Sequence, residues 1–157
     1  MIAPWCEPNQ RLAIVAQSVP TAVAVPCIAQ MPAGWSAGGV EVETGRTRFW
    51  LNSDRAGDHA VEIQLAATCD IDGATATARE LDWVQRYERS DQKAGRLHLT
   101  VLEVFDGGCI STSLDLPVGS ADMLAAEALD AASLYPREDL RAEMLERSGV
   151  DIGPAQP

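Results

Sequence analysis

Hydrophobic and polar residues alternate one by one over long stretches of this 157-residue chain, and the alternation limits the folds open to it. In residues 40–43 valine alternates with glutamate, and in 46–51 arginine and tryptophan alternate with threonine, phenylalanine and leucine. A period of two places successive side chains on opposite faces of a β-strand, and Thr44-Gly45 between the segments is a turn signal. The sequence therefore predicts a hairpin whose outer face sets two glutamates across from two arginines.

The same alternation predicts further strands, at residues 61–65, 83–88, 96–105 and 110–116. Asp106-Gly107-Gly108 is a turn signal between the last two, so these strands should pair antiparallel. Near the C-terminus, Ser120 is suited to cap a helix that runs through an alanine- and leucine-rich stretch to Leu134. Pro136 fits the first turn of a second helix, which Gly149 ends.

These elements predict an α+β fold, in which an antiparallel β-sheet of meanders and hairpins packs with two C-terminal helices. We expect a single domain over residues 1–150 and a flexible tail at 151–157. The segment 11–28 is apolar and β-branched but carries Pro20 and Pro26, which remove backbone donors, so short extended pieces are expected at 12–17 and 22–25. Residues 31–39 are expected to form a glycine-rich loop.

Four cysteines lie far apart, and none falls in a Cys-x-x-Cys pair, which argues against zinc and thioredoxin chemistry. Disulfide bonds and an oxidising compartment are the better-supported interpretation, the alternative being a cytosolic protein with four reduced thiols. The positions suggest Cys6 with Cys27 and Cys69 with Cys109. Four cysteines allow three pairings, however, and the sequence does not choose among them.

The chain is strongly acidic, with a formal net charge of −11 and a pI near 4.4. Nucleic acid is therefore excluded as a partner, and so are anionic lipid surfaces, because phosphate binding depends on clustered Lys and Arg. No stretch of about 18 apolar residues is present, and the first residues lack the pattern of an export signal. We expect a leader or membrane anchor before residue 1, so that membrane contact is made only through an anchor absent from this sequence.

Gly34-Trp35-Ser36-Ala37-Gly38 matches the Gly-x-Ser-x-Gly nucleophile elbow of serine hydrolases, with His98 and an aspartate such as Asp70 available as partners. The elbow needs a strand, a strained turn and a helix, and the sequence predicts no βαβ unit to supply them. A glycine-rich loop is the simpler interpretation.

Asp70-Ile71-Asp72-Gly73 resembles the start of a calcium loop but lacks its later ligands, so an Asp/Gly turn is favoured. The sequence predicts no catalytic, cofactor-binding or metal-binding residues. The loops most suited to binding carry Trp35 and the charged set Asp54, Arg55, Asp58 and His59. Trp50, on the outward side of its strand, is either covered by the N-terminal segment or the helices, which we favour, or is a binding anchor.

Several segments resemble uncharacterised extracytoplasmic domains of actinobacterial membrane-anchored proteins, and the similarity spans most of the chain. The segments are residues 16–22, 25–27, 31–36, 48–57, 86–89 and 107–109, together with the helical C-terminal end. The resemblance implies a single N-terminal membrane anchor, a domain outside the cytoplasm and cysteines in equivalent places. It implies no activity and no catalytic residues.

The sequence thus favours a binding or interaction module of the cell envelope, secreted or membrane-tethered, whose partner is an unknown protein or small ligand. The alternatives are a serine hydrolase that uses Ser36 and a purely structural accessory domain.

Overall fold

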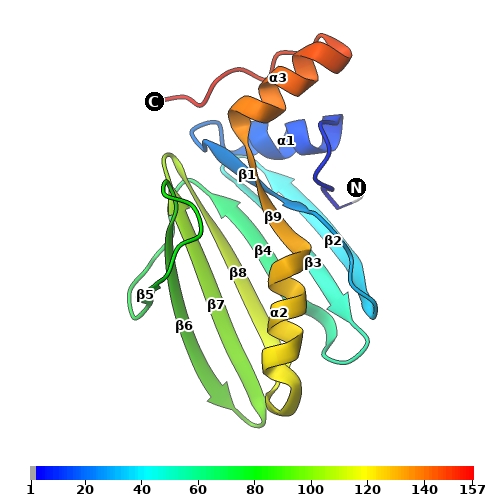
Figure 1. Cartoon of the computed structure of the whole chain (residues 1–157), viewed down its shortest axis with the longest axis vertical. Helices are drawn as coiled ribbons and strands as arrows, with labels where there is room; N and C mark the ends of the chain where they lie inside the picture. Colours follow the sequence, from blue (N-terminus) through cyan, green and yellow to red (C-terminus); the bar gives the residue numbers. More distant parts are fainter. Residues whose placement is uncertain (1–2) are drawn as a thin grey trace.

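The computed structural model describes residues 3–157, so residues 1 and 2 of the predicted domain lie outside the described part (Figure 1). Its main element is a seven-stranded antiparallel sheet. From one edge to the other the strands are β2 (Trp35–Glu43), β3 (Arg46–Ser53), β4 (Gly57–Ala66), β8 (Gly108–Pro117), β7 (Arg96–Phe105), β6 (Gln85–Lys93) and β5 (Thr75–Thr77). Together with the helices described in the next paragraph, this sheet confirms the predicted α+β fold.

A second layer covers one face of this sheet, which we call the inner face (Figure 1). It contains the antiparallel pair β1 (Ala24–Ile28) and β9 (Ala132–Pro136), and the helices α1 (Gln10–Ser18) and α2 (Ala121–Ala131). The last helix, α3 (Arg137–Ser148), directly follows β9, and a 3₁₀ turn, Val118–Ser120, precedes α2. The two C-terminal helices that the sequence predicts are therefore α2 and α3.

The hairpin of β2 and β3 has the predicted register. Glu41 lies opposite Arg48 and Glu43 opposite Arg46, and both pairs are bridged by their side chains on the outer face. On the inner face, every second residue of β3 is buried. The core between the layers includes these fully buried side chains: Phe49, Leu51, Ile63, Leu65, Leu116, Leu124 and Leu140.

The extended piece predicted at 12–17 is wrong, because these residues belong to helix α1. The side chain of Asn9 accepts a hydrogen bond from the backbone N–H of Leu12, which caps the first turn. Leu12, Val15 and Ala16 follow a helical spacing and are all buried against the core. The second extended piece exists as β1, which contains Pro26.

Three predicted boundaries also shift. The glycine-rich loop is shorter than expected, because β2 already begins at Trp35, and the strand predicted at 83–88 instead runs from Gln85 to Lys93. The helix expected to reach Leu134 ends at Ala131, because the next residues pair with β1 as β9. A distant pairing thus overrides the local preference of alanine and leucine for helix.

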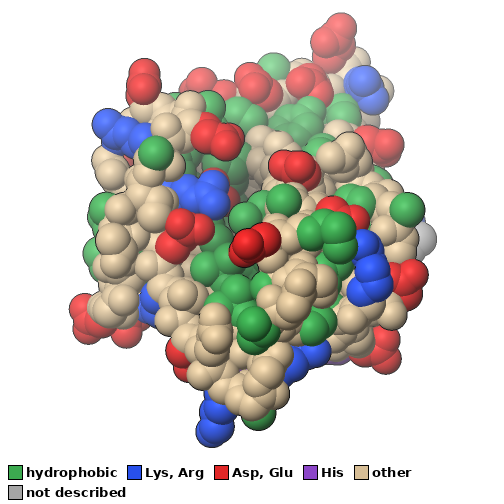
Figure 2. All heavy atoms as spheres, turned by 60° about the horizontal axis from the view of Figure 1, so that its bottom comes forward, with side chains coloured by type: hydrophobic (Ala, Val, Ile, Leu, Met, Phe, Trp, Pro, Cys, Tyr) green, Lys and Arg blue, Asp and Glu red, His purple; other side chains and the backbone are tan. Residues whose placement is uncertain are grey.

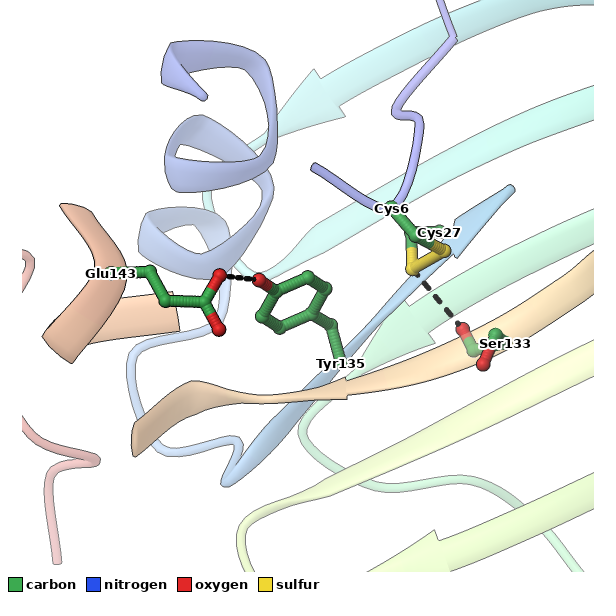
Figure 3. The surroundings of a disulfide bond; sticks show 5 residues. All are labelled: Cys6, Cys27, Ser133, Tyr135 and Glu143. Atoms are coloured by element: carbon green, nitrogen blue, oxygen red, sulfur yellow. Dashed lines mark hydrogen bonds between the residues drawn. A yellow bond between two sulfur atoms is a disulfide. The ribbon is translucent and has the colours of Figure 1, made fainter. Parts of the chain in front are cut away.

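All four cysteines are disulfide-bonded, Cys6 to Cys27 and Cys69 to Cys109, as the positions suggested. The first bond joins the N-terminal segment to β1, and the Sγ of Cys27 lies 3.6 Å from the carbonyl oxygen of Ser133 in β9 (Figure 3). The Tyr135 hydroxyl, farther along β9, donates to the Glu143 carboxylate of α3. Two disulfides fit an oxidising compartment.

Arg137, at the start of α3, is buried with 2% of its surface exposed. Its guanidinium donates to the carbonyl oxygens of Ala22, Ala16 and Val19 at 2.6, 2.5 and 3.0 Å. These carbonyls belong to α1 and to the connection between α1 and β1. One side chain therefore links the start of α3 to the N-terminal part of the covering layer.

Residues 151–157 form no helix or strand, yet Asp151 pairs with Arg141 and the backbone N–H of Gln156 donates to the Pro20 carbonyl. Within residues 3–157, none of the helices has the length and apolar character needed to span a membrane.

Candidate functional site

A cleft of about 340 Å³ lies between the inner face of the sheet and the covering layer. Its floor is formed by Ile63, Val101, Ile110 and Thr112 of three adjacent strands. Across from the floor stand the C-terminal end of α2 and the residues of β9 that follow it. Ligand sites in proteins commonly have volumes of roughly 300–1,000 Å³. This cleft has that size, and its lining mixes an apolar floor with charged side chains.

Glu103 and Arg86 supply the charge inside the cleft. They are directly opposite each other on β7 and β6, and both line it. Arg86 forms its ion pair with Glu88, at 3.6 Å, on the same strand. Within residues 3–157, Glu103 has no ion-pair partner within 4.0 Å, and burial raises the pKa of its carboxyl, while Arg86 opposes the rise and Glu80 adds to it.

The segment 79–84 forms the rim of the cleft. Arg79, Glu80, Leu81 and Val84 line it, and Leu81 is 41% exposed although it is apolar. Trp83 of the same segment, 42% exposed, lines a separate open groove of about 430 Å³ beside the start of α3. Figure 2 shows a hollowed face of the molecule, where hydrophobic side chains lie deep and acidic and basic side chains surround them.

The residues predicted to bind a ligand lie at another place, around the start of β2. Trp35 is buried, with 6% of its surface exposed, so its ring belongs to the core. Asp54 and Arg55 form an ion pair at 3.3 Å, and Arg55 also pairs with Glu127 of α2 at 3.0 Å. These charges fasten the loop to α2.

Asp58 and His59, at the start of β4, are exposed. The imidazole of His59 stacks on Trp50 with 4.9 Å between ring centroids, and the guanidinium of Arg48 lies 5.2 Å from the same ring. Our expectation that the helices or the N-terminal segment cover Trp50 is wrong, since α1 and α2 pack on the inner face. Trp50 is covered in part by its neighbours on the sheet.

Ser36 is the second residue of β2 and pairs with Asn52 of β3. It lies within a hairpin, without the strand–turn–helix geometry that exposes a hydrolase nucleophile. His98 lies on β7, four strands away in the sheet order.

Asp70 accepts a hydrogen bond from the backbone N–H of Asp72, and the carbonyls of both accept from Arg89. The segment is therefore a turn held by an arginine, which agrees with the interpretation that the sequence favoured.

Sequence reasoning missed the cleft, although one signal was present. Leu97, Leu99 and Val101 alternate at inward positions of β7, and the next inward position is Glu103. A carboxylate at a position the alternation assigns to the core marks a place where the core is open or functional.

Comparison with known proteins gives little. No family model and no curated protein matches the sequence. Among solved structures, the chain is similar to a crystal structure from Bacteroides thetaiotaomicron VPI-5482, with a TM-score of 0.38 and 14% sequence identity. The match covers 84% of this chain and 61% of that chain, so this chain spans less than two thirds of its length. A likeness at this level supports no argument about function.

Proposed function

We propose that the protein is a binding module of the cell envelope, secreted or membrane-tethered, and that the cleft between the sheet and the α2–β9 layer holds its ligand. The observation that carries the proposal is the cleft itself, a hollow of about 340 Å³ with an apolar floor and a half-buried carboxylate, that of Glu103, which forms no ion pair within 4.0 Å in residues 3–157. The two disulfides support the compartment.

A neutral apolar fluorophore, N-phenyl-1-naphthylamine, tests the cleft, because its emission rises when it leaves water. We expect saturable binding to the wild-type protein. Leu129→Trp, on the half-exposed side of α2 that lines the cleft, should fill the space and weaken binding on the order of tenfold, about 1.4 kcal/mol. Ala126→Trp on the exposed side of the same helix is the matched control and should bind as the wild type does.

The start of β4, with Asp58 and His59, remains a predicted surface for a protein partner. Asp58→Ala with His59→Ala should leave binding of the fluorophore unchanged, because neither residue lines the cleft. Absence of saturable binding to the wild type, or equal binding by Leu129→Trp, would contradict a ligand site in the cleft.

A further inference from the structure

The charged groups that line the cleft are unequal in number and in environment. Three carboxylates, from Glu80, Glu103 and Asp130, face two guanidiniums, from Arg79 and Arg86. Glu80, Arg79 and Asp130 are exposed on the rim, where water screens them. Glu103 and Arg86 are half-buried, so they set the chemistry of the interior.

These two interior groups differ in their ion pairs. The Arg86 guanidinium is engaged with Glu88 at 3.6 Å, whereas no ion pair within 4.0 Å satisfies Glu103 in residues 3–157. A half-buried carboxylate without an ion-pair partner has lost part of its hydration, which costs free energy. A hydrogen-bond donor that reaches the carboxylate offsets this cost. A ligand that brings such a donor gains a charge-assisted hydrogen bond.

Apolar side chains lie beside this carboxylate in the sheet, while Arg86 stands across from it on β6. Val101 lies two residues before Glu103 on β7, and Ile110, the cross-strand neighbour of Glu103 on β8, also lines the cleft. A ligand that fits must therefore combine a cationic, hydrogen-bond-donating head with an apolar body. The net charge of −11 also favours the approach of cations.

We propose that the cleft binds amphipathic amines, with the ammonium group on the Glu103 carboxylate and the hydrocarbon part on the floor formed by Val101 and Ile110. This proposal rests on the proposed function, because it names the ligand class of the same cleft. Arg86 stands opposite Glu103 on the neighbouring strand, so its positive charge offsets part of the attraction of the carboxylate for an ammonium group and disfavours a second one.

The test uses three eight-carbon ligands of similar size: octylamine, octanol and octanoate. Each is titrated by calorimetry against the wild type, Glu103→Gln and the control Glu62→Gln, a half-buried glutamate on the outer face of β4. We expect octylamine to bind the wild type and Glu62→Gln best. Glu103→Gln should bind octylamine on the order of tenfold to a hundredfold more weakly, with its octanol affinity unchanged.

The pH dependence provides a second readout. The affinity of the wild type for octylamine should fall as Glu103 takes up a proton, because a neutral carboxyl loses the charge that the ammonium group needs, and Glu103→Gln should lack this decline. Glu80, Asp130, Arg79 and Arg86 also face the cleft, so the difference between wild type and Glu103→Gln isolates the one group.

The outcomes separate the two proposals. If octanoate binds as well as octylamine, or if Glu103→Gln binds octylamine like the wild type, the ligand class is overturned and the cleft stands. If neither these ligands nor the naphthylamine probe binds the wild type, the proposed function itself fails. Thermal unfolding of each variant, expected near that of the wild type, shows that a loss of binding is not a loss of the fold.

Discussion

The two halves of the sheet differ in what lies over their inner faces. Over β3 and parts of β4 and β8 the covering layer is in contact, and Leu51, Leu65 and Leu116 are fully buried, while Ile63 and Ile110 of β4 and β8 line the floor of the cleft. Over β6 and β7 the cover is incomplete, and inward positions are taken by half-exposed Leu99, by Arg86 and by Glu103. Regular alternation thus marks the half that supports the fold, and its interruption marks the half available for binding.

The largest difference should appear when the same side chain is shortened in each half. Leu51→Ala, in the covered half, should lower the free energy of unfolding by about 2–5 kcal/mol, because it leaves a cavity that cannot collapse. Leu99→Ala, in the open half, should cost less than half of that, since water already reaches the site. Urea unfolding measures both, and equal losses would show that the halves do not differ in packing.

The two disulfides stabilise different parts of the molecule. Cys6–Cys27 holds the covering layer, and Cys69–Cys109 closes the longer loop, with sequence separations of 21 and 40 residues. Chain entropy assigns the bonds about 3 and about 4 kcal/mol respectively. Cys27 and Cys109 are both buried, so loop length decides the ranking, and the Cys69→Ala/Cys109→Ala double variant should lose slightly more than the Cys6→Ala/Cys27→Ala variant.

Chemical unfolding of both double variants provides the ranking. A clearly larger loss for the Cys6→Ala/Cys27→Ala variant would contradict this ranking and show that the first bond stabilises the covering layer by more than loop closure.

Arg137 should be the next most important contributor to the cover. Arg137→Met keeps much of the apolar length but leaves the carbonyls of Ala16, Val19 and Ala22 without their donor. We expect a loss of about 2–3 kcal/mol, typical of hydrogen bonds to a charged group. Arg141→Met, an exposed arginine of the same helix, is the control and should cost much less. Hydrogen exchange at the α1 amides would show whether the loss is local to the cover.

The smallest effect should come from Glu103→Gln in the open half. This substitution should stabilise the fold, whereas the substitutions above destabilise it. Burial raises the pKa of Glu103, so the folded protein binds this proton more tightly than the unfolded chain does. Stability from this group is therefore present below the ordinary glutamate pKa and is lost as pH rises through the raised value. Glutamine does not titrate, so the variant should melt higher at pH 7, by no more than about 3 °C.

The difference from wild type should shrink as the pH falls below the ordinary glutamate pKa and vanish near about pH 3, where Glu103 is protonated in both states. Melting curves between about pH 3 and 8 follow this difference. A variant that melts lower than wild type at pH 7 would show that the carboxylate stabilises the fold and is not held in place for a ligand.

The elements that the sequence predicted well are those with local signals. The hairpin of β2 and β3 carries its own turn and opposite charges, and Gly149 ends α3 with φ of 72°, a conformation that glycine adopts readily. The strand β7 matched its prediction at both ends, residues 96 and 105, because its alternation was long.

The elements that the sequence did not predict depend on distant contacts or on a weak local signal. β9 forms because β1 offers a partner, and residues 132–134 alone would continue the helix. In α1, the valine and isoleucine content suggested a strand, while the decisive cap at Asn9 was overlooked. Predicting the cleft would have required the register of β6 and β7 and the position of α2. In the sequence, only the charged residue Glu103 at an inward position indicated it.

The pairing of β1 with β9 has a consequence for how the chain assembles as it is made. Cys27 and Ser133, neighbours across the pair, are 106 residues apart in sequence. All seven strands of the sheet have been synthesised when residue 117 emerges, but α2 and β9 are complete only at residue 136. Until then the part of the inner face that α2 and β9 cover is an exposed hydrophobic surface, which makes the nascent chain prone to aggregation. A chain that stops before residue 132 would keep that surface permanently.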